Sequence, residues 1–172
     1  MPNYRRDREG RSYFFTVVSY RRHPLLCDAR IRSILRSKII ELRRRRSFAI
    51  DAWVLLPDHL HCIWTMPDSD TDFSSRWAWL KKEATKGAAR CGVIDRVGTS
   101  LWQPRFWEHR IRDDRDLRAH CDYIHWNPVR HGLVTRVGDW PWSTFHRFVA
   151  KGLLAPDWGN AGVKIAAGIG RE

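Results

Sequence analysis

A chain of 172 residues with 43% hydrophobic content is the size of one domain, which excludes a disordered tail or a small disulfide scaffold. Its 31 Lys and Arg against 19 Asp and Glu give a net charge of +12, which indicates a polyanionic partner such as nucleic acid. No apolar run approaches the roughly 20 residues that cross a bilayer, and no signal peptide is recognisable. We therefore expect a cytoplasmic protein with no membrane partner, in which four scattered cysteines stay reduced.

The first half of the chain is predicted to run strand, helix, strand, strand. After a basic arm at 5–11, a strand is expected at 13–19, where β-branched and aromatic residues are dense. Apolar residues at helical spacing predict a helix at 28–46, whose closing run of arginines suits either the helix dipole or a phosphate backbone. The apolar runs 48–56 and 59–66 surround a Pro-Asp turn and indicate a β-hairpin.

The second half is predicted to run helix, strand, helix, at 72–90, 106–111 and 114–127. Pro128 disfavours helical geometry at the residue before it, so the last helix is expected to end there. The order β-α-β-β-α-β-α predicts an α+β fold of the ferredoxin-like sandwich type, with a single antiparallel sheet and helices on one face.

The domain organisation is predicted from composition at the C-terminal end. Residues 1–150 are expected to form one domain with its short basic N-terminal arm. Glycine and alanine become frequent beyond that point, so 151–172 is expected to be a loosely held C-terminal tail. No internal repeat or low-complexity block divides the chain further.

Two histidines at the start of the predicted strand 59–66 form a candidate metal site. Side chains alternate along a strand, so His59 and His61 point the same way, with Cα atoms roughly 7 Å apart. Both imidazoles can then converge on one ion, although a single histidine is more often structural. The opposite face of the strand carries an apolar layer that is expected to pack against helices, namely Leu60, Cys62, Trp64 and Met66.

The last helix carries two stripes of side chains. Tyr123 and Asn127 lie one turn apart in the polar stripe and can reach a single site. Alone, they are equally well explained as a half-buried helix tyrosine and a C-cap. The apolar stripe, expected to face the core, is Leu117, Cys121 and Ile124, and the polar stripe is Asp116, His120, Tyr123 and Asn127.

The His-Leu-His pair, followed by a helical tyrosine with a side-chain amide four residues later, resembles the HUH single-tyrosine transposases. The likeness is closest to their REP-associated tyrosine transposase branch, related to the IS200-type enzymes, and it covers nearly the whole chain. Its motifs are short individually and specific in combination. They are 3–6 (NYRR), 13–18 (YFFTVV), 54–61 (VLLPDHLH), 102–109 (WQPRFWEH), 123–132 (YIHWNPVRHG) and 140–146 (WPWSTFH).

The resemblance implies a metal-dependent endonuclease and strand transferase acting on single-stranded DNA. Tyr123 would be the nucleophile that forms a 5′-phosphotyrosine and leaves a 3′-hydroxyl, so rejoining needs no nucleotide energy source. His59, His61 and Asn127 would hold Mg²⁺ or Mn²⁺. The IS200-type pattern has glutamine where this chain has Asn127, which offers the same amide oxygen on a shorter arm.

The implied partner is DNA whose short palindromic, REP-like repeats fold into hairpins, bound by a monomer or a homodimer. The chain contains ten tryptophans. Trp102 and Trp107 are candidates for stacking on bases, with core packing as the alternative for each. The candidate phosphate contacts are Arg5, Arg6, Arg21, Arg22, Lys81, Lys82 and Arg105.

Three other functions remain open at this point. A non-catalytic hairpin-binding or regulatory protein would share the basic charge and the aromatic residues. A zinc hydrolase could use Cys62 or His125 as further ligands, but Cys62 is expected on the face opposite the histidines. Replication initiators and relaxases share the histidine pair, but they are usually larger, and relaxases place the tyrosine before the histidines.

Overall fold

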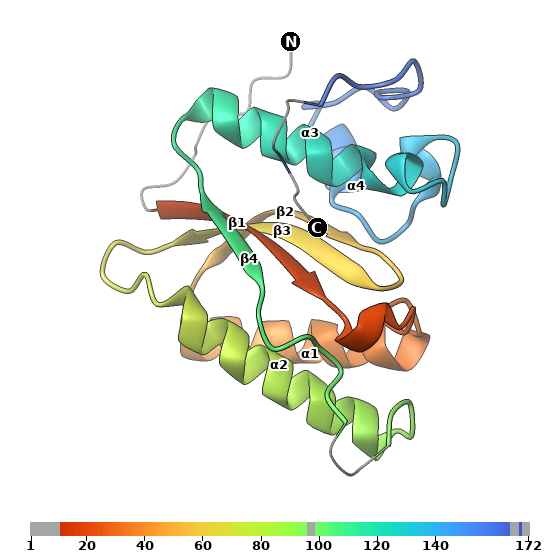
Figure 1. Cartoon of the computed structure of the whole chain (residues 1–172). Helices are drawn as coiled ribbons and strands as arrows, with labels where there is room; N and C mark the ends of the chain where they lie inside the picture. The colour runs from red at the N-terminus through yellow and green to blue at the C-terminus, as the bar shows by residue number, and fades with distance from the viewer. Residues whose placement is uncertain (1–10, 96–98, 166–168, 170–172) are drawn as a thin grey trace.

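A four-stranded antiparallel sheet lies at the centre of the computed structural model, which describes residues 11–95, 99–165 and 169. The strand order is β2-β3-β1-β4 (Figure 1), and the single antiparallel sheet agrees with the prediction from the sequence. No helix within the described ranges is long and apolar enough to span a bilayer. The strands are β1 (Arg11–Val18), β2 (Ala49–Leu55), β3 (His59–Met66) and β4 (Trp107–Arg110).

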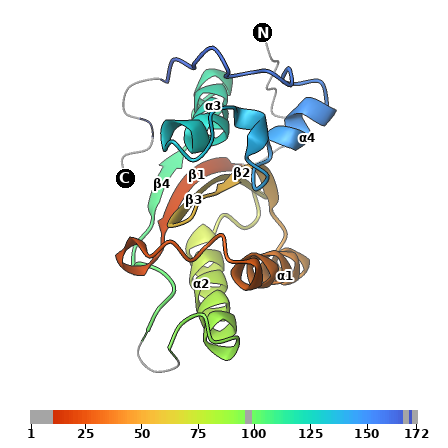
Figure 2. The same cartoon turned by 90° about the vertical axis from the view of Figure 1, so that its right-hand side faces the viewer.

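Helices cover both faces of this sheet, whereas the sequence predicted them on one face. The pair α1 and α2 lies on one side, and α3 with α4 lies on the other (Figures 1 and 2). The reason is visible in β3, all of whose residues are buried, so that each face needs a covering layer. The helices are α1 (Ala29–Arg45), α2 (Phe73–Arg90), α3 (Asp114–Arg130) and α4 (Phe145–Ala150), with short 3₁₀ turns at Tyr20–Arg22 and Val137–Asp139.

Aspartate N-caps fix where the three long helices begin. The carboxylates of Asp28, Asp72 and Asp113 accept hydrogen bonds from backbone N–H groups in the first turns of α1, α2 and α3, respectively. Each cap satisfies a donor that would otherwise lack a partner within the helix, a contribution of about 1 kcal/mol. The predicted starts of these helices therefore agree with the structure to within a residue or so.

Helix α3 does not end at Asn127, as Pro128 had suggested, but continues to Arg130. A proline in a helix removes one donor, and the surrounding backbone must close the turn without it. Here the His131 N–H donates to the Asn127 carbonyl at 3.0 Å, so the turn persists beyond the proline. This extra turn matters because it carries Arg130 toward the tyrosine.

The segment after α4 is packed against the protein where the structure describes it, in contrast to the loose tail expected from 151 onward. Leu154 is 5% exposed, and the ring of Trp158 lies 6.2 Å from that of Phe145. Ile165 also packs against the hydrophobic cluster beneath α3. Burial of these few large apolar side chains outweighs the glycine and alanine content on which the prediction rested.

The buried His125 makes stability depend on pH. Its Nε2 lies 3.0 Å from the Thr144 hydroxyl, and burial lowers the pKa of His125 to about 3 from the usual 6.5. Between those values the unfolded chain binds a proton that the folded protein does not, so the free energy of unfolding falls as pH falls. Titration of His125 changes the free energy of unfolding by at most about 1.4 kcal/mol per pH unit.

We expect the urea midpoint to decrease between pH 7 and pH 5, and His125→Gln to reduce that decrease. The exposed His23 provides a matched control, because His23→Gln should keep the wild-type dependence. Equal pH dependence in the wild type and His125→Gln would show that this imidazole is not the group responsible.

Candidate functional site

The histidine pair points away from the α1–α2 side of the sheet. Leu60 and Cys62 pack in the cluster shared with α1 and α2, as the alternation of side chains predicted. His59 and His61 lie on the α3 side, with ring centres 4.8 Å apart and exposed fractions of 2% and 0%. The two imidazoles are thus adjacent, buried and on the same face as the tyrosine helix.

Each histidine is oriented through its Nδ1 atom. His59 Nδ1 lies 2.7 Å from Asp58 Oδ1, and His61 Nδ1 lies 2.8 Å from the Thr16 hydroxyl. Such contacts set the ring orientation, and where Nδ1 donates they fix the tautomer, so that Nε2 is the nitrogen a metal would use. Neither Asp58 nor Thr16 was singled out in the sequence, although Asp58 directly precedes the pair.

Asp58 is itself held in its charged form. Burial alone would raise the pKa of Asp58, but the contacts from His59 and from Arg22 outweigh burial and lower it. The guanidinium of Arg22 donates to Asp58 at 3.0 Å. A negative charge beside Nδ1 favours its donating N–H and increases the basicity of the opposite nitrogen.

Removing the Asp58 carboxylate should weaken metal binding without preventing folding. We expect Asp58→Ala to lower Mn²⁺ affinity by about 10- to 100-fold, because the ring of His59 loses its orienting partner. Isothermal titration calorimetry with MnCl₂ measures this directly. The exposed Asp68 provides a control with the same charge change, and Asp68→Ala should bind Mn²⁺ like the wild type. An unchanged affinity in Asp58→Ala would remove Asp58 from the site.

Tyr123 lies beside the histidine pair. Its ring centre is 5.1 Å from that of His61, and Phe14 packs edge-on against it at 6.0 Å. The Arg130 guanidinium donates to the Tyr123 hydroxyl at 2.7 Å. Arg130 was missed from the sequence because it lies beyond Pro128, and its spacing of seven residues from Tyr123 is the signal that could have found it.

Asn127 is the third predicted ligand and is completely buried. Neither its amide oxygen nor its amide nitrogen has a hydrogen-bond partner among the described residues. Leaving such a group without a hydrogen bond in the protein interior costs about 1–3 kcal/mol. We therefore expect a partner from outside the protein to bind this amide. One amide oxygen and two imidazoles form a donor set that suits Mg²⁺ or Mn²⁺, and the residues present therefore fit the implied metal.

A second group of ligand-type side chains joins β4 to α3. Ligand atoms of His109, Asp116 and His120 all lie within 4.8 Å of one another and could hold a metal ion. Hydrogen bonds already connect them, with His109 Nε2 at 2.8 Å from Asp116. Burial opposes ionisation of Asp116, but the bonds from His109 and Arg112 prevail and lower its pKa to about 2. Phe14 separates this group from His61.

Two pairs of candidate phosphate contacts can be compared directly with the structure. Arg21 and Arg22 adopt left-handed backbone conformations, with φ of 52° and 54°, at the turn after β1. Lys81 donates to the Pro104 carbonyl at 2.9 Å, and burial lowers its pKa, so this ammonium holds a loop. Lys82 is exposed on α2. The remaining pair, Arg5 and Arg6, lies outside the described residues.

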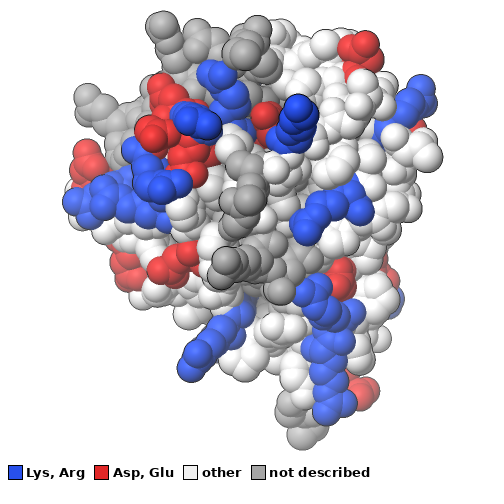
Figure 3. Space-filling view, turned by 45° about the horizontal axis from the view of Figure 1, so that its top comes forward, with Lys and Arg blue, Asp and Glu red and all other residues white. Residues whose placement is uncertain are grey.

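The candidates around β4 differ in exposure. Arg105 is exposed, and Trp107 is half-buried with its ring parallel to that of His109 at 6.0 Å. Trp102 is 1% exposed and packs in the core beneath α2, so the core-packing alternative holds for it. Figure 3 shows basic side chains spread over the α3 side in several groups, with acidic ones beside some of them, rather than in one patch.

Comparison with known proteins identifies the family. No family model matches the chain. The REP-associated tyrosine transposase of Escherichia coli strain K12 is 48% identical over 169 residues, which cover 98% of this chain and 97% of that protein. The chain belongs to the REP-associated tyrosine transposases. A Haemophilus influenzae relative named for the same family is 40% identical over 184 residues, covering 98% of this chain and 100% of that protein.

The fold of a REP-associated tyrosine transposase is confirmed by a solved structure. That structure, of a family member bound to a REP hairpin, superimposes with a TM-score of 0.76 at 48% identity. The match covers 97% of this chain and 100% of the other. The family resemblance and the single antiparallel sheet predicted from sequence are both correct.

Proposed function

We propose that this REP-associated tyrosine transposase is a metal-dependent single-strand DNA endonuclease and strand transferase. It would cleave and rejoin hairpin-forming, REP-like DNA through a 5′-phosphotyrosine. The observation that carries this proposal is the 5.1 Å separation between the rings of Tyr123 and His61, which belong to separate layers of the fold. A nucleophile and a pair of metal ligands meet there, and the orphaned amide of Asn127 lies one turn further along the same helix.

The proposed chemistry uses five side chains and one ion. His59, His61 and Asn127 would hold Mg²⁺ or Mn²⁺, which when bound supplies polarisation of the scissile phosphate. The Tyr123 oxygen gives its proton to water and forms a new bond to phosphorus as the bond to the 3′-oxygen breaks. That oxygen takes a proton from water and leaves as a 3′-hydroxyl. The guanidinium of Arg130, 2.7 Å from the phenol oxygen, favours negative charge there as the proton departs.

The proposed substrate is a DNA hairpin with single-stranded flanks, encountered in the cytoplasm by a monomer or a homodimer. The net charge of +12 supports binding to a polyanion, and the solved relative was bound to a REP hairpin. The proposed contacts on the described surface are Arg21, Lys82, Arg105 and Trp107, with Arg5 and Arg6 added from the sequence.

The alternative is a non-catalytic hairpin-binding protein. One observation favours it: Tyr123 is only 1% exposed, and a nucleophile must meet its phosphate. The zinc-hydrolase alternative is not supported, because Cys62 faces the opposite core and His125 is hydrogen-bonded to Thr144.

A denaturing gel distinguishes the endonuclease from the non-catalytic binding protein. The wild-type protein is incubated with end-labelled hairpins drawn from repeats flanking its gene, with MnCl₂ or MgCl₂ and with EDTA. We expect a covalent protein–DNA adduct that requires the metal. Tight hairpin binding in a native gel, with no adduct in either metal, would establish the binding protein instead.

A further inference from the structure

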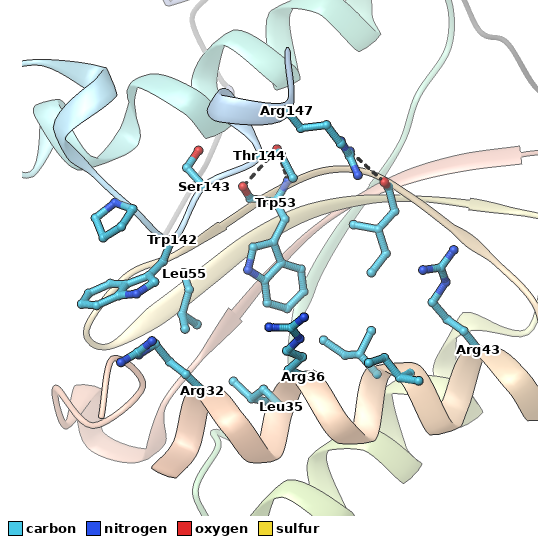
Figure 4. Close-up of a pocket in the computed structure, with 14 residues that line it drawn as sticks. Arg32, Leu35, Arg36, Arg43, Trp53, Leu55, Trp142, Ser143, Thr144 and Arg147 are labelled. Carbon is cyan, nitrogen blue, oxygen red and sulfur yellow. Dashed lines mark hydrogen bonds between the residues drawn. The ribbon is translucent and has the colours of Figure 1, made fainter. Parts of the chain in front are cut away.

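A groove of about 730 Å³ lies along the β2 edge of the sheet, away from the histidine pair. Its floor is the apolar surface of α1 and β2, and its far wall is the segment 141–147 (Figure 4). That segment pairs with β2 through Val54 and Ser143, which closes the edge of the sheet without filling the groove. The volume is within the ~300–1,000 Å³ range of ligand-binding pockets.

The groove has the electrostatics of an anion site. Arg32, Arg36 and Arg43 reach it from α1, and Arg147 reaches it from α4 on the other side (Figure 4). None of its 14 lining residues carries a carboxylate. Arg36 is exposed and makes no hydrogen bond or ion pair with any described residue, so its charge has no counterion within that part of the protein.

Two tryptophans give the same groove flat apolar surfaces. Trp53 projects from β2 toward α1, and Trp142 lies at the end of the groove, with the Arg32 guanidinium over its ring at 4.7 Å (Figure 4). Both rings are half-buried, so each has surface left to contact a ligand. Single-strand nucleic-acid sites typically combine arginines that contact the phosphate backbone with aromatic rings on which bases stack.

Single-stranded DNA fits this groove better than a duplex does. A duplex is read by elements that protrude into its grooves, whereas a recess lined by indoles takes unstacked bases. Leu55, which lines the groove, pairs with Leu60, and both side chains pack on the α1–α2 side of the sheet, so the groove and the histidine pair lie on opposite faces of the sheet.

We propose that this groove is a binding subsite for the single-stranded DNA that flanks the hairpin, an inference that rests on the proposed function. Its role is to hold the phosphates against the arginines and the bases against Trp53 and Trp142. Arg36, Trp53 and Trp142 were not among the contacts predicted from the sequence, because the segment 141–147 that completes the groove is far from α1 and β2 in the chain. Arg43 belongs to the arginine run for which the sequence left a phosphate contact open.

Binding of two matched hairpins tests the proposal. Fluorescence anisotropy is measured in a Tyr123→Phe background, which removes the nucleophile, with one hairpin that carries a labelled single-stranded extension and one that lacks it. We expect Arg36→Glu to weaken binding of the extended hairpin by about tenfold or more and of the blunt hairpin by less than twofold. Arg44 is exposed on the same helix outside the groove, and Arg44→Glu should leave both affinities within twofold.

Photocrosslinking locates the strand independently of affinity. An extension containing 5-iodouracil should crosslink to Trp53 or Trp142, as identified by mass spectrometry of the peptides. Crosslinks confined to other segments would overturn the proposal. So would equal effects of Arg36→Glu and Arg44→Glu, or equal effects of Arg36→Glu on both hairpins.

Two further outcomes are distinguishable. A dimer in light scattering that Arg36→Glu converts to a monomer would make the groove an interface between copies of the chain and overturn the proposal. If the wild type forms no covalent adduct but the extension still binds through Arg36, the catalytic proposal fails and the subsite stands.

Discussion

A Tyr123→Phe variant is expected to form no detectable covalent adduct with hairpin DNA, a loss of at least about 10³-fold relative to the wild type. Phenylalanine keeps the ring that packs against Phe14 and His61 and removes only the hydroxyl oxygen that is proposed to attack phosphorus. The fold and hairpin affinity should therefore remain, with Kd within about twofold. The adduct is measured on a denaturing gel, and the affinity by anisotropy.

Tyr20 supplies the control, since it is 37% exposed and Tyr20→Phe removes a hydroxyl elsewhere on the surface. The Tyr20→Phe variant should form the covalent adduct at the wild-type rate. If Tyr123→Phe still forms the adduct, peptide mapping of the DNA-linked residue identifies the true nucleophile, and the role proposed for Tyr123 is wrong.

The double variant His59→Ala/His61→Ala is expected to lose both cleavage and the response to metal. Removing both imidazoles leaves Asn127 unable to hold a divalent ion alone, and the phosphate loses a polarising charge worth several kcal/mol of transition-state stabilisation. We expect adduct formation to fall by about 10³-fold or more. Wild-type thermal stability should rise with saturating MnCl₂, by about 2.7 kcal/mol at 100 times Kd, and the double variant should show no rise.

Two comparisons make this result specific. His23→Ala, at an exposed position, should keep both cleavage and the metal response. His120→Ala removes a member of the second ligand-type group and should keep the stabilisation by Mn²⁺. Stabilisation that survives in the double variant and disappears in His120→Ala would place the ion between β4 and α3, contrary to the proposal.

The sequence predicted the parts of the fold that depend on local pattern. Alternation along β3 correctly placed Leu60 and Cys62 in one core, away from the two histidines, and helical spacing correctly put Leu117 in the core beneath α3. The face of the sheet that α3 would cover was not predictable from such patterns, because β3 is apolar on one face and carries histidines on the other. Histidines can equally face solvent or a covering helix.

The rest of the site depends on contacts between distant segments. Arg130 reaches Tyr123 only because the helix continues through Pro128, against the usual preference of the residue before proline. Thr16 orients His61 across the β1–β3 ladder, a pairing over 45 residues. Register between strands and the persistence of a helix turn depend on tertiary contacts. The motif therefore predicted the candidate nucleophile and metal ligands but not the residues that contact them.

The placement of the histidines on β3 has a consequence for how the protein opens. This strand is hydrogen-bonded on both sides, to β1 and β2, and layers of helices cover both its faces. Backbone amides in such a position exchange with solvent only through the largest unfolding events. We therefore expect the imidazoles to be anchored in the slowest-exchanging part of the molecule, and fraying of the outer helices to leave their spacing intact.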